Sequence, residues 1–232
     1  MTLRLAVFDL DGTLAKVGQP AKLEVSRKLR KLERLGIKIV FASGKNVSYL
    51  RGFARGIGVN PVFIIAENGC LVFDVEKIEE KKLVKVTEEM LKIKNEVLKQ
   101  FGESVWIQPS YVELTVVPKN QKMIQNLASF ICRVAEPYKD ELVTIVHEHA
   151  VDVLPAQINK GKGLLEVMKV LNVPKDEVVA IGDESSDIPM FKNAGLSVVV
   201  GNNPIAYSKA KRFNDICKAL NFLNDVFSAH NG

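Results

Sequence analysis

Five short apolar segments, each followed at once by a polar or glycine-rich turn, constrain the fold of this 232-residue chain more than any other feature. Such segments are typical of strands buried on both faces, and helical periodicity fills most of the intervals between them. The expected strands cover residues 3–8, 37–41, 62–65, 178–181 and 196–200. The expected helices cover residues 21–35, 49–57, 163–171, 189–194, 203–210 and 214–228. This alternation predicts an α/β fold with a Rossmann-like, doubly wound parallel sheet.

The middle of the chain follows a different pattern, in which a helix and two strands occur twice in succession. Helices are expected at residues 88–101 and 120–135, and strands at 105–108, 111–117, 142–146 and 150–154. This order is typical of an antiparallel sheet with helices on one side. We therefore expect a small α+β domain at residues 83–153, inserted into a core of residues 1–82 and 154–232.

Composition and charge narrow the classes of partner. Lys and Arg number 32 against 27 for Asp and Glu, a formal charge of +5 that suits an anionic ligand. The positive residues form no block or arm, so we expect no nucleic-acid partner. No apolar run is long enough for a signal-peptide core or a bilayer span, which predicts a cytoplasmic protein without a membrane partner. The three cysteines lie far apart and are expected to be reduced thiols.

Polar residues follow all five expected strands of the core. The residues that end or follow them are Asp9, Ser43, Glu67, Asp183 and Gly201. Because the carboxyl ends of parallel strands meet at one edge of a sheet, these residues are expected to converge on one crevice.

Asp11 and Asp187 bring two further carboxylates to this edge, beside Asp9 and Asp183. Four carboxylates repel one another unless a cation lies between them. Oxygen ligands without His or Cys are typical of a hard cation, so the sequence predicts Mg²⁺. A cation beside a Ser and a Lys is typical of a phosphate site, and Lys160 lies where the chain re-enters the core. The chain has no GxxxxGK[ST] or GxGxxG motif, so a P-loop or dinucleotide site has no support.

Four motifs now point to a known family. The sequence Asp-Leu-Asp-Gly-Thr at residues 9–13 matches the DxDGT signature of the haloacid dehalogenase-like phosphatases. Ser43 with Gly44 resembles the second motif of that family, Lys160 with the glycine after it resembles the third, and residues 182–187 resemble the fourth. The motifs occur in the family's order. The insert resembles a C2-type cap, and the whole chain is similar to the archaeal phosphoglycolate phosphatases and, more distantly, to sucrose-phosphate and Cof-like phosphatases.

Two positions depart from the family's pattern. Lys45 stands where the family often has Arg, which keeps the charge and loses the bidentate guanidinium. Ser186 stands where Asn commonly precedes the last Asp, and keeps a hydrogen-bonding group. Neither change removes a catalytic group.

The resemblance implies a role for each motif residue. Asp9 would be the nucleophile that forms an aspartyl-phosphate, and Asp11 the general acid and base. The metal ligands would be Asp9, Asp183, Asp187 and Asp11, the last through its backbone carbonyl. The phosphoryl oxygens would be held by Ser43, Gly44 and Lys160. The implied activity is Mg²⁺-dependent hydrolysis of a small phosphorylated metabolite, with 2-phosphoglycolate as the best single candidate.

Three questions stay open at this point. A phosphotransferase or sugar-phosphate mutase would use the same aspartyl-phosphate, and a non-enzymatic phospho-acceptor switch would also gather acidic residues, Ser and Lys at strand ends. His147 and His149 have a metal-like spacing on an expected strand of the insert, and surface positions or contact with substrate are the alternatives. The oligomeric state is open as well, with a homodimer as one option.

Overall fold

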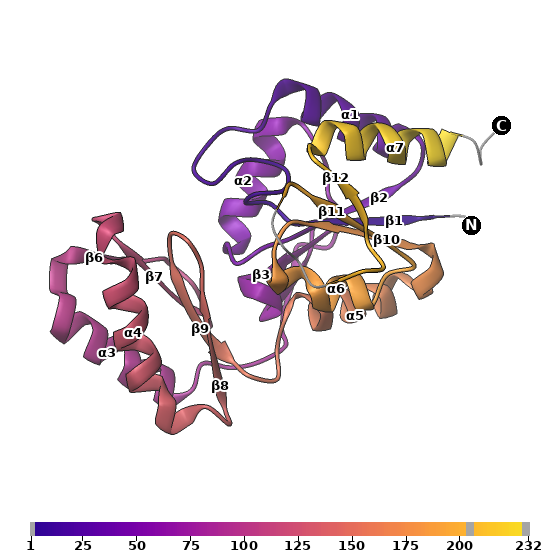
Figure 1. The fold of residues 1–232 in the computed structure, drawn as a ribbon. Helices are drawn as coiled ribbons and strands as arrows, with labels where there is room; N and C mark the ends of the chain where they lie inside the picture. The colour runs from indigo at the N-terminus through magenta and orange to yellow at the C-terminus, as the bar shows by residue number, and fades with distance from the viewer. Residues whose placement is uncertain (1–2, 203–206, 229–232) are drawn as a thin grey trace. The chain divides into compact units, whose positions relative to one another are not determined.

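The computed structural model describes residues 3–202 and 207–228, and its core contains a main sheet of eight strands (Figure 1). The strand order is β12-β11-β10-β1-β2-β3-β4-β5. The strands are β1 (Leu5–Phe8), β2 (Lys38–Ala42), β3 (Phe63–Ala66), β4 (Leu71–Asp74), β5 (Glu79–Lys82), β10 (Val178–Gly182), β11 (Leu196–Val200) and β12 (Lys211–Phe213). Strands β12 through β3 pair in parallel, and β4 pairs antiparallel with β3.

Helices cover both faces of this sheet. They are α1 (Leu23–Arg34), α2 (Val47–Ile57), α5 (Lys160–Leu171), α6 (Ile188–Lys192) and α7 (Ile216–Ser228). In Figure 1, α1 and α7 lie together above the sheet, and α5 and α6 lie together below it. All four residues of β1 are fully buried, as a central strand covered on both faces requires.

The middle of the chain forms a second, antiparallel sheet with strand order β6-β7-β9-β8. Its strands are β6 (Val105–Ile107), β7 (Leu114–Pro118), β8 (Leu142–Val146) and β9 (Val151–Pro155), and its helices are α3 (Glu88–Phe101) and α4 (Ile124–Ala135). Alternate strand residues, among them Val116 and Val153, pack against Ile93 and Ile131 of the two helices. The chain thus consists of two compact units, Met1–Lys81 with Asn159–Gly232, and Lys82–Ile158.

The two sheets confirm the predicted fold class, an α/β core with a small α+β insert. Strands β4, β5 and β12 were not predicted. Strand β5 reads Glu-Glu-Lys-Lys and β12 reads Lys-Arg-Phe, so neither has the apolar pattern of a strand, and pairing with a neighbour decides their conformation. The helix predicted at 203–210 is wrong for residues 207–210, which form a turn before β12, and residues 203–206 lie outside the described part of the chain.

Candidate active site

The carboxyl ends of β1, β2, β3 and β10 lie side by side in the core, as their parallel register requires. Asp9 follows β1, and its backbone N–H donates to the carbonyl of Ile181 at 2.9 Å. Ser43 follows β2, and its backbone N–H donates to the carbonyl of Ile65 at 3.0 Å. Asp183 follows β10. The sheet therefore brings together residues that are up to 174 positions apart in the chain.

Three of the predicted metal ligands form one buried cluster. Asp9, Asp183 and Asp187 each offer a carboxylate oxygen within 4.8 Å of the others. Lys160, the first residue of α5, places its Nζ 2.6 Å from Asp9 Oδ1 and 2.8 Å from Asp187 Oδ1. One buried ammonium group thus bridges two of the three carboxylates.

The turn after β10 holds Asp187 in place from its other side. Asp187 Oδ2 accepts hydrogen bonds from the backbone N–H groups of Asp183 at 2.9 Å and Glu184 at 3.1 Å. With the bond from Lys160, both carboxylate oxygens of Asp187 are engaged, and the residue is fully buried. This arrangement suits a residue that orients the turn and reaches a metal ion through water. Ser186, the departure from the family's pattern, lies in the 3-10 turn η6 (Ser185–Asp187).

Asp183 is positioned by the loop after β1. The Thr13 hydroxyl donates a hydrogen bond to Asp183 Oδ1 at 2.7 Å, and both side chains are buried. Gly12 has a φ of 90°, and a Cβ at that position would overlap the Asp183 carboxylate. The glycine of the DxDGT motif is therefore needed both for the turn and for the space that Asp183 occupies.

Burial and mutual repulsion dominate the electrostatics of the cluster. Burial raises the pKa of Asp9 well above its usual range, Lys160 opposes this rise, and the charges of Asp187 and Asp183 add to it. Burial, together with the charges of Asp187 and Glu184, raises the pKa of Asp183 to about 6 in spite of the Thr13 hydrogen bond. Burial tends to lower the pKa of Lys160, but Asp187 and Asp9 outweigh it and the pKa is raised, so Lys160 is permanently charged.

This donor set fits a hard divalent cation. Three buried carboxylates with one lysine leave two negative charges uncompensated when all are ionised, and the raised pKa values express that cost. A divalent cation among carboxylate oxygens removes the cost, and oxygen-only ligands are those that Mg²⁺ prefers.

Two loops form the next part of the site. The backbone carbonyls of Ser43 and Lys45 accept hydrogen bonds at 3.0 and 3.1 Å from the N–H groups of Asn68 and Glu67. Ser43 Oγ accepts a hydrogen bond from the N–H of Lys45 at 3.2 Å, and Gly44 lies between them in the same turn. Both loops are thus held to each other by backbone bonds beside the carboxylate cluster.

The second of these loops is conformationally unusual. Glu67 and Asn68 are buried and both have a positive φ, at 51° and 52°, a region that side-chain-bearing residues rarely adopt. Gly69 follows at a φ of 100°, where a Cβ would overlap the carbonyl of Asn159. Asn159 is the N-cap of α5 and accepts a hydrogen bond from the N–H of Lys162. Close packing of this loop on the start of α5 therefore positions Lys160.

Asp11 lies apart from the buried cluster. Its Oδ2 is 3.7 Å from Nζ of Lys45, and both side chains are partly exposed. In the sequence, Lys45 stands out only as a departure from the family's Arg. In the structure it is the cationic neighbour of Asp11. A partly exposed carboxyl group near a buried carboxylate cluster suits a residue that exchanges protons with solvent and substrate.

The histidines of the insert do not form a metal cluster. Within residues 3–202 and 207–228, the group of acidic, His or Cys side chains close enough to hold a metal ion is the Asp9 cluster. His147 Nε2 lies 3.0 Å from Asp152 Oδ2, and His149 Nε2 lies 3.8 Å from the exposed Glu148. Asp152 was not predicted; the signal was a carboxylate at an alternate position of an apolar strand.

Asp152 belongs to a second buried polar cluster, on the sheet face opposite α3 and α4. Its strand neighbours Val151 and Val153 pack against those helices, so Asp152 faces away from them, as does Thr115 opposite it on β7. Burial tends to raise the pKa of Asp152, but the hydrogen bond and charge of His147 outweigh it, and Glu113 and Thr115 act in the same direction, so this pKa is lowered.

Comparison with known proteins agrees with these motifs and this geometry. The chain matches a family model described as haloacid dehalogenase-like hydrolase over residues 6–126 and 107–213. It therefore belongs to the haloacid dehalogenase-like hydrolases, and the resemblance that the four motifs carry is confirmed.

Among the described residues, no helix is both long and apolar enough to cross a bilayer.

Individual relatives extend the likeness over nearly the whole chain. A phosphoglycolate phosphatase of Methanopyrus kandleri is 27% identical over 216 residues, which cover 91% of this chain and 89% of that protein. The crystal structure of protein 0175 of Thermoplasma acidophilum is similar, with a TM-score of 0.80 at 17% identity, over 98% of this chain and 99% of that one. A haloacid dehalogenase-like hydrolase from Bacteroides thetaiotaomicron is similar with a TM-score of 0.77 at 18% identity, over 96% and 100% of the two chains. At these identities the two structures support the fold alone.

Proposed function

We propose that this protein is a Mg²⁺-dependent phosphomonoesterase that hydrolyses a small phosphorylated metabolite through an aspartyl-phosphate on Asp9. One observation carries the proposal: Asp9 lies in a buried carboxylate cluster that needs a cation, and the ammonium group of Lys160 is 2.6 Å from it. A nucleophile that attacks a phosphate dianion needs positive charge around it, because the two anions otherwise repel each other.

Asp9, Asp183 and Asp187, with the backbone carbonyl of Asp11, would hold the Mg²⁺ ion. When bound, the ion would supply charge that draws the phosphoryl group toward Asp9 and offsets its negative oxygens. Lys160, the Ser43 hydroxyl and the backbone N–H of Gly44 would bind the phosphoryl oxygens. Thr13 would orient Asp183 through the hydrogen bond at 2.7 Å.

The reaction would proceed in two displacements at phosphorus. In the first, an Asp9 oxygen forms a bond to phosphorus as the ester P–O bond breaks, and Asp11 protonates the departing alkoxide. In the second, Asp11 takes a proton from water as the water oxygen bonds to phosphorus, and the Asp9 carboxylate leaves with its electron pair. The products are the alcohol and inorganic phosphate, and both carboxyl groups return to their starting states.

We propose 2-phosphoglycolate as the preferred substrate. The support is the 27% identity, over nearly the full chain, to a phosphatase named for that substrate. A fold supports many substrates, so the similarity in fold to other phosphatases adds no preference.

The test is phosphate release from a panel of phosphorylated metabolites, including 2-phosphoglycolate, with Mg²⁺ and with EDTA. Wild type is expected to hydrolyse 2-phosphoglycolate with the highest kcat/KM, and EDTA to abolish turnover. Asp9→Asn is expected to lower kcat by at least about 10³-fold, because the amide is not a nucleophile. Acid quenching of wild type during turnover is expected to trap labelled phosphate on the protein, and Asp9→Asn to trap none.

Asp176→Asn is the matched control, since Asp176 is an exposed aspartate of the same unit. It should leave every parameter unchanged. Asp9→Asn should also unfold at no lower temperature than wild type in EDTA, because the raised pKa of Asp9 shows that its charge costs folding free energy. Full activity in Asp9→Asn would refute the assignment of Asp9 as the nucleophile. Transfer of the label to a sugar in place of water would establish the phosphotransferase, and a label that persists without turnover would establish the phospho-acceptor switch.

A further inference from the structure

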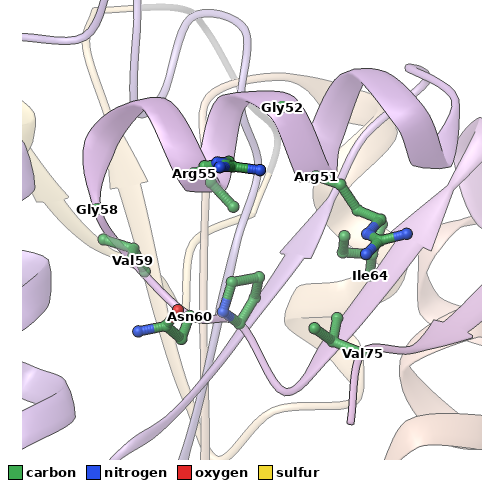
Figure 2. A pocket seen from close by; sticks show the side chains of 10 residues that line it. Arg51, Gly52, Arg55, Gly58, Val59, Asn60, Ile64 and Val75 are labelled. Carbon is green, nitrogen blue, oxygen red and sulfur yellow. The ribbon is translucent and has the colours of Figure 1, made fainter. Parts of the chain in front are cut away.

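A pocket lies in the core unit along the C-terminal half of α2 (Figure 2). Its volume is about 520 Å³, within the range of small-molecule sites. Its lining includes Asn60, which precedes the amino end of β3, whereas Ser43 and Glu67 follow the carboxyl ends of β2 and β3. The pocket therefore lies toward the opposite end of the strands from the predicted catalytic residues, and none of those residues lines it.

The floor of this pocket is apolar and its rim is cationic. The apolar lining consists of Ala54, Val59, Pro61, Ile64 and Val75. Arg51 and Arg55 are one helical turn apart, and Figure 2 shows both side chains leaving the same side of α2. A third arginine, Arg30 of α1, lies near Gly58 of the lining, because a Cβ on Gly58 would lie 3.8 Å from its Nη1.

These three arginines are not neutralised by the chain. Within the described ranges, none of their guanidinium groups lies within 4.0 Å of a carboxylate oxygen. The acidic group at the rim, Glu33, instead accepts a hydrogen bond from the backbone N–H of Asn60 at 2.6 Å. Arg51 is held in place by Phe73, with its guanidinium carbon 5.1 Å from the ring centroid. The pocket thus has an excess of positive charge beside an apolar surface, with Glu33 paired to none of the three arginines.

We propose that this pocket is a second ligand site, which binds a small organic anion with an apolar body. Arg51 and Arg55 bind the anionic group, since a guanidinium forms paired hydrogen bonds to phosphate, carboxylate or sulfonate oxygens. The apolar floor binds the body of the ligand and removes it from water.

A fluorescence titration with 8-anilinonaphthalene-1-sulfonate tests the site, because this probe joins a sulfonate to an apolar ring system and contains no phosphate ester. Wild type is expected to bind it at one saturable site. The double variant Arg51→Gln, Arg55→Gln is expected to bind at least about tenfold more weakly, since two charged hydrogen-bonding groups are lost. N-phenyl-1-naphthylamine, which lacks the sulfonate, is expected to bind wild type and the double variant equally weakly.

Two further variants separate binding from folding. Gly52→Phe is expected to leave the helix intact, because a Cβ at this position meets no atom within 4 Å, and to weaken binding, because the ring would stand at the edge of the pocket that Gly52 lines. Arg133→Gln is the matched control: Arg133 also lies over a phenylalanine, with its guanidinium carbon 5.3 Å from the ring of Phe130, but it belongs to the other unit. It should bind as wild type does.

The proposal is overturned if wild type shows no saturable binding, if Gly52→Phe and the double variant bind as wild type does, or if the neutral probe binds as tightly as the sulfonate. Since the probe is not a phosphatase substrate, each result is independent of whether the protein hydrolyses phosphate esters.

Discussion

The two units of this protein each bury a cluster of acidic side chains, and they compensate the charge in different ways. In the core, Asp9, Asp183 and Asp187 face one lysine, whose charge is permanent. In the insert, Asp152 faces His147, whose charge depends on pH. The core cluster has an excess of negative charge when its carboxylates are ionised, which a bound cation or a proton can offset. In the insert cluster, the hydrogen bond and charge of His147 lower the pKa of Asp152. Buried carboxylates thus favour a metal site where the side chains around them do not offset their charge.

The largest effect on stability is expected from removing the permanent positive charge of Lys160. Lys160→Met leaves Asp9 and Asp187 without their buried partner, and should lower the free energy of unfolding in EDTA by about 3–5 kcal/mol. Lys162→Met, two residues along the same helix and exposed, should change it by less than about 0.5 kcal/mol. Urea denaturation measures both. Equal stability of the two variants would show that Lys160 does not compensate the cluster.

A pH series separates a cluster that needs a cation from one that does not. The pKa of Asp183 is raised to about 6, so the metal-free folded state holds a proton that the unfolded state releases at lower pH. Stability in EDTA should therefore fall as pH rises from about 4 to about 6, by on the order of 2 kcal/mol. Mg²⁺ should restore stability at pH 7 and have little effect at pH 4.5, where protons compete with it.

Thermal unfolding across this range, with EDTA and with Mg²⁺, measures the effect. Asp183→Asn supplies the control, because it cannot ionise: it should lose the contribution of Asp183 to this pH dependence, keep that of Asp9, and lose most of the Mg²⁺ effect. A wild-type stability in EDTA that rises steadily from pH 4 to pH 6 would contradict the raised pKa of Asp183 and the burial and charge repulsion that explain it.

A smaller effect is expected from the hydrogen bond that orients Asp183. Thr13→Val keeps the shape of the side chain and removes the donor, which should cost about 1–2 kcal/mol of folding free energy and weaken Mg²⁺ activation about 10- to 100-fold. Thr13→Ser retains the hydroxyl and should restore most of the metal affinity. If valine and serine behave alike, packing and not the hydrogen bond explains the role of Thr13.

The smallest effect is expected in the insert. His147→Gln removes the positive partner that lowers the pKa of Asp152, and should reduce the free energy of unfolding at pH 7 by about 1 kcal/mol. Stability from a lowered pKa is lost as pH falls, so the difference from wild type should shrink below about pH 4. His149→Gln changes an exposed histidine and should have no measurable effect. Equal losses in the two variants would show that the Asp152 contact is not stabilising.

Much of the core was predictable because its strands are apolar on both faces. Residues 3–8 and 178–181 predicted β1 and β10 within two residues, since no other conformation buries such short apolar runs as well. Strand β12 was not predictable, because Lys211 and Arg212 are exposed at the sheet edge and their conformation comes from pairing with β11. The start of α5 at Lys160 was placed three residues late, because Gly161 and Gly163 weaken the helical pattern there.

The sequence by itself determined which residues reach the candidate site. Parallel strands all end at one edge, so Asp9, Ser43 and Asp183 had to converge once the strands were recognised. Only the tertiary structure decided the pairings: that Lys160 bridges Asp9, 151 positions away, to Asp187, that Thr13 binds Asp183, and that Lys45 faces Asp11. The physical reason is the distance along the chain over which each feature is determined. Strand direction follows from local patterns, whereas a contact of a few ångströms between distant residues depends on how the whole sheet and its helices pack.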